Sequence, residues 1–350
     1  MYRISVPDAK SRYRLAELAN MFLRPSDYEF VIDPNPLTSY DLIVGDAAGN
    51  SNEQKQLVYD FFAQQTGRTL DWGILTGVRP VKLLAEMLQT RTFAEADALL
   101  REEYRVSKEK ADLLSEVYRT QLSVNFHKAP PAVGLYIGIP FCPSRCLYCS
   151  FPSNVISRDG SEKYLDALYK EIDAVAARIG TLGWYAESVY IGGGTPTSLD
   201  ASQLQELLRR ISQRLITERT REFTVECGRP DTIDKDKLNA ITHWGAERIS
   251  INPQTMVDRT LERIGRSHNA QQIRDAFSLA KACGIPLINA DLIAGLPGED
   301  PKDFRYSLEQ VLLLKPANIT VHTLAVKKAS RLIEEDQDYA FRTEIGRAHV

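Results

Sequence analysis

The sequence predicts an α/β protein whose main part is a parallel (βα)6-type partial TIM barrel, preceded by a smaller α/β N-terminal domain. Six short apolar segments alternate with predicted helices after residue 130, and parallel strands need such crossover helices. Right-handed crossovers would curl the strands into a barrel or partial barrel. The predicted strands are Gly134–Ile139, Ser188–Ile191, Phe223–Cys227, Arg248–Asn252, Leu287–Ile293 and Asn318–Leu324.

The predicted helices between these strands each carry apolar residues on one side. In the helix of residues 161–179, Leu165, Leu168 and Ile172 recur at three- and four-residue steps, as an amphipathic helix requires. A second helix opens at Asp200, with Gln203 three residues on, in the pattern of a capping box. The others are Lys235–His243, Val257–Ile264, Ala270–Cys283 and Pro301–Leu314.

The chain divides into four predicted regions. Residues 1–128 form an N-terminal domain without a chemistry-bearing motif, and a linker with two adjacent prolines, residues 127–133, leads into a core of residues 129–330. Residues 331–343 begin a truncated C-terminal region. Residues 344–350 match the translation of a widely used DNA sequencing adaptor, so we expect them to be an artefact rather than a functional segment. A chance match is the alternative.

Composition narrows the classes of partner. The chain has 350 residues with 43 Lys and Arg against 46 Asp and Glu, a net charge of -3, so we expect neither nucleic acid nor a membrane as partner. Residues 1–10 lack a signal-peptide core, and no apolar run approaches the roughly 20 residues of a membrane span. These features predict a cytoplasmic protein. In a reducing compartment, three of the five cysteines within eight residues suggest metal rather than disulfides.

The cysteines Cys142, Cys146 and Cys149 form a Cx3CxxC motif directly after the first core strand. Three thiolates suit a [4Fe–4S] cluster and leave one iron open. The open iron can chelate the methionine end of S-adenosylmethionine, and one electron from the cluster can cleave its sulfonium to a 5′-deoxyadenosyl radical. The alternative is structural zinc, which normally takes four protein ligands.

Several further candidates follow the strands. The glycine run that includes Gly193 and Gly194 would let backbone groups approach a ligand closely. Because the carboxyl ends of parallel barrel strands form one face, we expect residues from different strands to meet there. Solvated strand ends, a surface arginine or a structural hydrogen bond are the alternatives. The candidates are Thr195, Glu226, Gln254, Arg266 and Asp291, and His243, His268 and His322 favour structural roles.

Residues 134–330 resemble the radical S-adenosylmethionine family of oxygen-independent coproporphyrinogen III oxidases (coproporphyrinogen dehydrogenases). The shared motifs are Tyr136-Ile-Gly-Ile-Pro-Phe-Cys, Cys-Leu-Tyr-Cys, Gly-Gly-Gly-Thr-Pro-Thr, Arg-Ser-His and Asp-Leu-Ile-Ala-Gly-Leu-Pro-Gly. Glu-Cys-Gly-Arg-Pro-Asp, Ile-Asn-Pro-Gln and the long N-terminal extension look most like its HemZ branch. The chain departs from the family at Gly138, where a histidine is usual, and in the spacing between Glu226 and Pro230.

The resemblance implies one S-adenosylmethionine bound at Tyr136, Gly193 and Glu226, with no catalytic side chain beyond the cluster ligands. It implies oxidative decarboxylation of two propionates of coproporphyrinogen III to vinyls, giving protoporphyrinogen IX, with a reductase, ferredoxin or flavodoxin as electron donor. Two alternatives stay open: a haem chaperone of the same family, and a non-catalytic, zinc-stabilised module. A second S-adenosylmethionine would contact Tyr148, Gly194, Thr195, Gln254, Arg266, Asp291 and Ala325.

Overall fold

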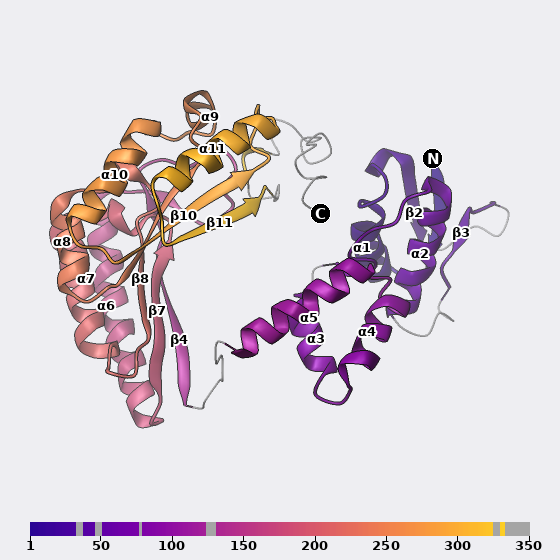
Figure 1. The fold of residues 1–350 in the computed structure, drawn as a ribbon, viewed down its shortest axis with the longest axis horizontal. Helices are drawn as coiled ribbons and strands as arrows, with labels where there is room; N and C mark the ends of the chain where they lie inside the picture. The colour runs from indigo at the N-terminus through magenta and orange to yellow at the C-terminus, as the bar shows by residue number, and fades with distance from the viewer. Residues whose placement is uncertain (33–37, 46–50, 77–78, 124–130, 325–329, 333–350) are drawn as a thin grey trace. The chain divides into compact units, whose positions relative to one another are not determined.

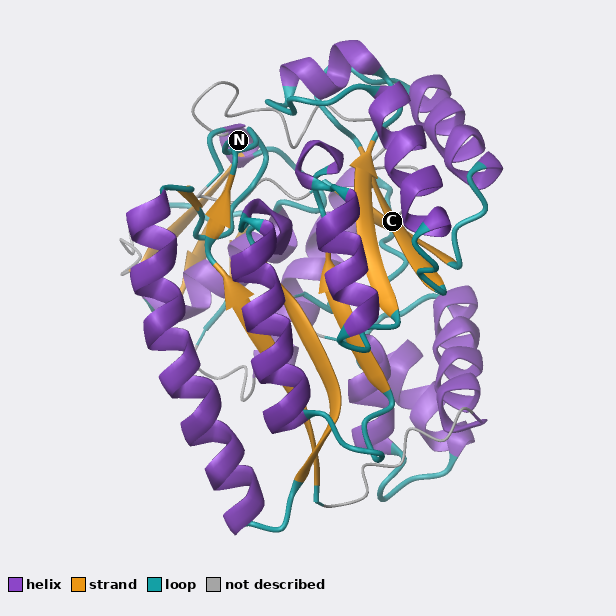
Figure 2. Cartoon of the chain, turned by 90° about the vertical axis from the view of Figure 1, so that its left-hand side faces the viewer, coloured by secondary structure: helices purple, strands orange, loops and turns teal. Residues whose placement is uncertain are grey.

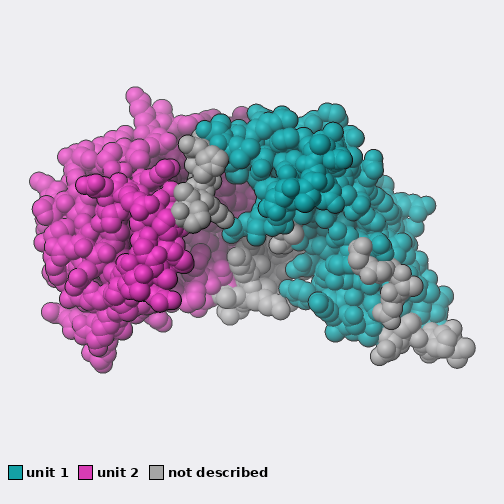
Figure 3. Space-filling model, turned by 90° about the horizontal axis from the view of Figure 1, so that it is seen from below, with its two compact units in different colours: residues 1–127 teal, residues 128–350 magenta. Residues whose placement is uncertain are grey.

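The computed structural model describes residues 1–32, 38–45, 51–76, 79–123, 131–324 and 330–332. It divides into two compact units, Met1–His127 and Lys128–Val350, coloured separately in Figure 3. In the described residues no helix is both long and apolar enough to cross a membrane.

The second unit is built on a six-stranded parallel sheet in the order β11-β10-β9-β8-β7-β4. The α/β prediction with a parallel, partial barrel is therefore confirmed, and β4 and β11 form its two edges. The predicted linker is shorter than expected, because β4 already begins at Ala132; residues 127–130 lie outside the described part. The strands are β4 (Ala132–Ile139), β7 (Tyr185–Gly193), β8 (Glu222–Glu226), β9 (Arg248–Gln254), β10 (Leu287–Ala294) and β11 (Asn318–Thr323).

Helices cover one face of this sheet, and the strands are visible behind them in Figure 2. Side chains from both layers are fully buried, among them Ile191, Leu204, Ile249 and Phe277. Parallel strands that are buried beneath crossover helices are nearly continuous apolar runs. This is why the sequence predicts the six core strands clearly. The helices, labelled in Figure 1, are α6 (Arg158–Thr181), α7 (Ala201–Leu215), α8 (Lys235–His243), α9 (Asp258–Arg263), α10 (Ala270–Ala282) and α11 (Pro301–Leu313).

The predicted capping box of α7 is present. Asp200 Oδ1 accepts a hydrogen bond from the Gln203 amide (2.8 Å), and Gln203 Oε1 accepts one from the Asp200 amide (3.2 Å). These bonds satisfy amides that a helix N-terminus leaves without partners. The apolar stripe that follows is buried throughout: Leu204, Leu207, Leu208, Ile211 and Leu215.

We expect Asp200→Ala to lower the free energy of unfolding by about 1 kcal/mol, the usual cost of losing an N-cap. Urea denaturation followed by circular dichroism measures the loss. Gln205→Ala, on the exposed side of the same helix, is the matched control and should leave stability unchanged or slightly higher, because alanine is a good helix former. Equal stability of Asp200→Ala and the wild type would contradict the role of the cap.

The first unit contains a three-stranded parallel sheet in the order β2-β1-β3, with Ile4, Leu15 and Phe62 in its core. In this region the sequence predicts strands at Tyr2–Val6 and Asp41–Val44, where the structure has β1 and β3, and helices around Gln54–Gln64, Val81–Gln89 and Ser107–Tyr118, where it has α2, α3 and α5. It does not predict β2, α1 or α4. In α1 charged residues interrupt the apolar positions, so its one-sided pattern is weak. The elements are β1 (Tyr2–Val6), α1 (Ala9–Ala19), β2 (Tyr28–Ile32), β3 (Leu42–Ile43), α2 (Ser51–Thr66), α3 (Pro80–Met87), α4 (Phe93–Glu102) and α5 (Lys108–Ser123).

Candidate active site

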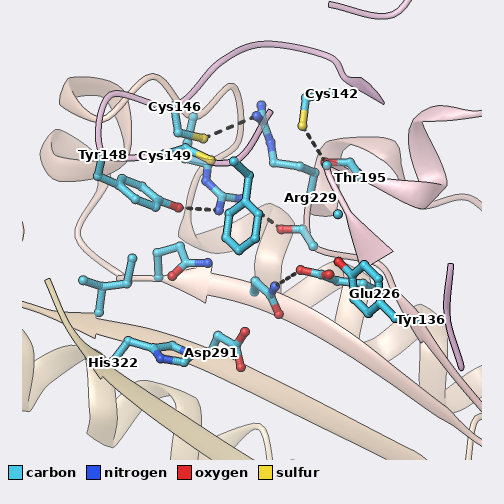
Figure 4. Close-up of a pocket in the computed structure, with 18 residues that line it drawn as sticks. Tyr136, Cys142, Cys146, Tyr148, Cys149, Thr195, Glu226, Arg229, Asp291 and His322 are labelled. Carbon is cyan, nitrogen blue, oxygen red and sulfur yellow. Dashed lines mark hydrogen bonds between the residues drawn. The ribbon is translucent and has the colours of Figure 1, made fainter. Parts of the chain in front are cut away.

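A cavity of about 290 Å³ lies at the carboxyl ends of the core strands. Side chains from the cysteine loop and from the ends of β7 to β11 line it, as Figure 4 shows. Ala325 lies outside the described residues, and every other predicted site residue lies on the cavity wall. These are Tyr136, Cys142, Cys146, Tyr148, Cys149, Gly193, Gly194, Thr195, Glu226, Gln254, Arg266 and Asp291.

The cysteine loop, residues 142–149, is hydrogen-bonded to segments that lie far away in the chain. Its first cysteine ends the short strand β5 (Phe141–Cys142), which pairs with β6 (Asn154–Val155). A hydrogen bond of 3.4 Å joins Cys142 Sγ and Thr195 Oγ1. The amide of Leu147 donates to Ile264 O (3.0 Å). The carbonyl of Leu147 accepts hydrogen bonds from Ser330 Oγ (3.0 Å) and from the Leu332 amide (3.1 Å).

The three thiols fit a [4Fe–4S] cluster. All three cysteines line the same cavity. Burial raises the pKa of Cys149 above that of a free thiol, and the neighbouring Cys146 and Cys142 add to this effect. Within the described ranges, no three His, Cys, Asp or Glu side chains are grouped to hold a single metal ion. A cube takes each cysteine on a different iron, so wider spacing of the thiols suits it.

The glycine run at the end of β7 packs against the cysteine loop. Gly193 has φ +106°, which favours glycine. A Cβ on Gly194 would lie 2.5 Å from the carbonyl oxygen of Phe141. The amides of Gly194 and Thr195 donate to Ile139 O (2.8 Å) and Phe141 O (2.7 Å). These two amides therefore hold the protein's own loop. The close approach of a ligand to Gly193 and Gly194, which line the cavity, stays a prediction.

Gly194→Ala is expected to lower the free energy of unfolding by about 1–3 kcal/mol, because the added methyl group forces backbone apart. We expect it also to reduce the iron retained after anaerobic reconstitution, since the displaced backbone carries Cys142. Denaturation and iron analysis measure the two effects. Gly180→Ala is the matched control: Gly180 lies in α6 with no atom near its Cβ position, so its stability should stay equal or rise. Unchanged stability of Gly194→Ala would refute the steric account.

Glu226 ends β8 in a largely buried position. Its carboxylate accepts hydrogen bonds from Asn252 Nδ2 (3.1 Å) and from the Tyr190 hydroxyl (3.5 Å). Burial, together with the nearby charge of Asp291, raises the pKa of Glu226 to about 7. Tyr136 stacks on Tyr190 with ring centroids 5.7 Å apart. An ionised Glu226 could accept hydrogen bonds from an amine or a ribose hydroxyl in the cavity.

Arg266 is a half-buried cation on the cavity wall. Its guanidinium donates to the Tyr148 hydroxyl and to Gly228 O, both at 2.8 Å. Its Nε is buried without a partner, and among the described carboxylates none forms an ion pair with it. A planar guanidinium in this state suits a ligand carboxylate. Gln254, close by on the cavity wall, has φ +68°, which is rare for a residue with a side chain and common at functional sites.

The cavity also contains residues that sequence reasoning did not assign. Arg229, Asn252 and Phe151 line it, and so does His322, for which a structural role was favoured. Asn252 and His322 lie near the ends of strands, as the predicted site residues do. This position along the sequence is the signal that could have identified them. The other two histidines lie elsewhere: His268 is buried against Asp231 (3.1 Å), and His243 packs on Trp244.

The sequence pattern of the Radical SAM superfamily matches residues 136–311, which run from β4 through the cysteine loop into α11. This chain belongs to that superfamily. Radical SAM proteins use a [4Fe–4S] cluster and S-adenosylmethionine, so the predicted cofactors are confirmed at the level of the family. The residues that hold them in this radical SAM protein stay predictions.

Named relatives narrow the resemblance. The radical SAM protein is 39% identical over 283 residues to the oxygen-independent coproporphyrinogen-III oxidase-like protein HemZ of Bacillus subtilis, covering 78% of this chain and 56% of the relative. It is 36% identical over 193 residues to the heme chaperone HemW of the same organism, covering 55% and 50%. The predicted family is confirmed, and the chain spans about half the length of the curated relatives it matches.

A solved structure agrees with this placement. The coproporphyrinogen III oxidase HemN of Escherichia coli, described as a radical SAM enzyme, superimposes with a TM-score of 0.51 and 25% identity. The match covers 65% of this radical SAM protein and 56% of HemN. Oxidases and chaperones thus both occur among its relatives, and family membership alone does not separate the two activities.

Proposed function

We propose that this radical SAM protein oxidatively decarboxylates two propionates of coproporphyrinogen III to vinyls, giving protoporphyrinogen IX. Cys142, Cys146 and Cys149 would hold the cluster. One observation carries the proposal: the three thiols share a single cavity with the polar residues at the ends of β7 to β10. A porphyrinogen is the expected substrate, and a reductase, ferredoxin or flavodoxin the expected electron donor.

Bound in this cavity, the cluster and S-adenosylmethionine would supply a 5′-deoxyadenosyl radical able to take a hydrogen atom from an unactivated carbon. The protein's own groups would orient the cofactor. Tyr136, Gly193 and Glu226 would contact the first S-adenosylmethionine, with Glu226 ionised above about pH 7 and able to accept from its ammonium or ribose. Arg266 would pair with a carboxylate.

Binding of a second S-adenosylmethionine is supported by the polar groups on the cavity wall that the first S-adenosylmethionine would not contact. Arg266 and Asp291 are separate charged groups on the cavity wall, and neither contacts the other by a hydrogen bond among the described residues. Each could bind a different polar end of a ligand. The residues proposed for this site are Tyr148, Gly194, Thr195, Gln254, Arg266, Asp291 and Ala325.

In the proposed reaction each propionate loses a hydrogen atom from its β-carbon, then CO2 and one further electron. That electron must leave to an acceptor, so the reaction needs a donor for cluster reduction and an acceptor for the product. Phe151 and Ile293 add apolar side chains to the cavity wall.

Haem binding without turnover is the second candidate, favoured by the 36% identity to a heme chaperone. The two functions differ in what they consume. An oxidase uses S-adenosylmethionine in proportion to the propionates it converts, whereas a chaperone retains haem without forming a vinyl product.

The deciding experiment reconstitutes the chain anaerobically with iron and sulfide, then adds S-adenosylmethionine, dithionite and coproporphyrinogen III. We expect deoxyadenosine and protoporphyrinogen IX to form together, both quantified by chromatography. Deoxyadenosine without protoporphyrinogen would remove this substrate and retain the radical chemistry. Stoichiometric haem binding without deoxyadenosine would establish the chaperone instead. Absence of a cluster from the reconstituted chain would overturn the oxidase proposal.

A further inference from the structure

Arg229 is a buried cation beside the cysteine loop. It precedes Pro230, which disfavours helical backbone at the preceding residue, and its φ and ψ of -125° and 107° are extended. This backbone turns the side chain inward from the end of β8 toward the cysteines. Only 2% of Arg229 is exposed. A guanidinium so deeply buried needs partners for its five N–H donors.

One edge of the Arg229 guanidinium faces the cysteine loop. Its Nη1 donates to Ser144 Oγ (3.1 Å) and to the Ser144 carbonyl oxygen (3.4 Å). The same nitrogen lies 3.8 Å from Cys146 Sγ, within hydrogen-bonding range for sulfur, along the dashed line at Cys146 in Figure 4. Arg229 thus contacts both the backbone of the loop and the sulfur of a cysteine.

The other edge is anchored from behind. Nε and Nη2 donate to the two oxygens of Asp231, at 3.1 and 3.3 Å, in a bidentate pair. Asp231 also bonds His268 Nδ1 (3.1 Å), whose ring is fully buried. Nη2 reaches Ser267 Oγ at 3.4 Å. These contacts fix the plane of the guanidinium, so that Nη1 points at the cysteine loop.

A fixed cation at this place has a consequence for electron transfer. Adding one electron to the cluster increases its negative charge, and a positive group a few Å away stabilises the reduced form more than the oxidised one. Hydrogen bonds to ligating sulfurs act in the same direction. The Asp231 carboxylate offsets part of the charge, but it lies at the far edge of the guanidinium.

We propose that Arg229 is a positioning residue that donates a hydrogen bond to Cys146 Sγ and favours the reduced state of the cluster that Cys146 helps to hold. The inference rests on the proposed function, since it takes Cys146 as a cluster ligand. The electron comes from an external one-electron donor such as dithionite. Arg229 keeps its proton throughout, and no bond to it forms or breaks.

Potentiometric titration of the reconstituted chain, followed by electron paramagnetic resonance of the reduced cluster, tests the proposal. We expect Arg229→Gln to lower the equilibrium constant for cluster reduction about tenfold, which corresponds to a fall of about 59 mV for one electron. Arg229→Lys keeps the charge but loses the planar fork, so its fall should be smaller. Arg259→Gln, in an exposed ion pair with Asp303, is the control and should leave the potential unchanged.

The outcomes are separable. An Arg229→Gln cluster with the wild-type potential would overturn the role of Arg229 and leave the proposed function standing. If Arg229→Gln retains no iron, Arg229→Lys decides: a lowered potential supports the inference and an unchanged one overturns it. If the wild-type chain assembles no cluster, the proposed function itself fails, and iron analysis shows this before any potential is measured.

Discussion

Cys146→Ala is expected to lose the iron–sulfur cluster and, with it, at least about 100-fold in deoxyadenosine formation, since even residues that only support a metal ligand cost 10–100-fold when removed. Cys146 is buried in the loop between Cys142 and Cys149. Two remaining thiolates cannot hold three corners of a cube. Iron and sulfide content, the visible absorbance and deoxyadenosine yield after anaerobic reconstitution measure the loss.

Cys283→Ala is the matched control. Cys283 follows α10 as its C-cap, and its thiol is free, but it does not line the cavity. This variant should retain wild-type iron and activity. Full iron content in Cys146→Ala, or an equal loss in Cys283→Ala, would contradict the assignment of the cluster to the Cx3CxxC loop.

The second large effect is a pH dependence of stability at Glu226. In the folded protein this carboxyl keeps its proton up to about pH 7, against an ordinary pKa of 4.5. Between these values the unfolded state binds fewer protons than the folded state, so the free energy of unfolding falls as pH rises. The raised pKa of Glu226 adds to the free energy of unfolding below about pH 4.5, and this addition is lost as pH rises through about 7. The free energy lost is on the order of 3 kcal/mol.

Urea unfolding of the wild type and of Glu226→Gln from pH 4.5 to pH 8 measures this effect. The amide does not ionise, so Glu226→Gln should escape the loss, and the difference between the two free energies should grow with pH. Glu222→Gln, at the exposed start of the same strand, is the control and should follow the wild type. Parallel curves for wild type and Glu226→Gln would show that Glu226 does not titrate near pH 7.

The sequence was most informative where the chemistry is local. Three cysteines within eight residues, and the Asp200–Gln203 capping box, are readable because spacing along the chain decides them. Arg229 was not assigned, because its role depends on contacts with Ser144 and Cys146 more than eighty residues earlier. Such contacts depend on strand order and register, which residue patterns do not encode.

The same limit applies to details of the site. The sequence does not predict that the amides of Gly194 and Thr195 bond to the segment before the cysteines. Nor does it predict that His322, for which it favours a structural role, lines the cavity. Both depend on which strand end lies opposite another. In the first unit, α1 is not predicted because charged residues dilute its apolar pattern. The strand β2, which is also not predicted, has only one charged residue, Glu29, among five.

The hydrogen bonds from Ser330 and Leu332 to Leu147 have a consequence for biogenesis. A ribosome makes Cys149 long before Leu332, and at 5–20 residues per second the interval is roughly 10–40 seconds. During that time the thiols have emerged, but the bonds that fasten Leu147 from the far end of the sheet do not yet exist. Iron delivery therefore meets a finished pocket only after β11 and the residues up to Leu332 have been translated and docked.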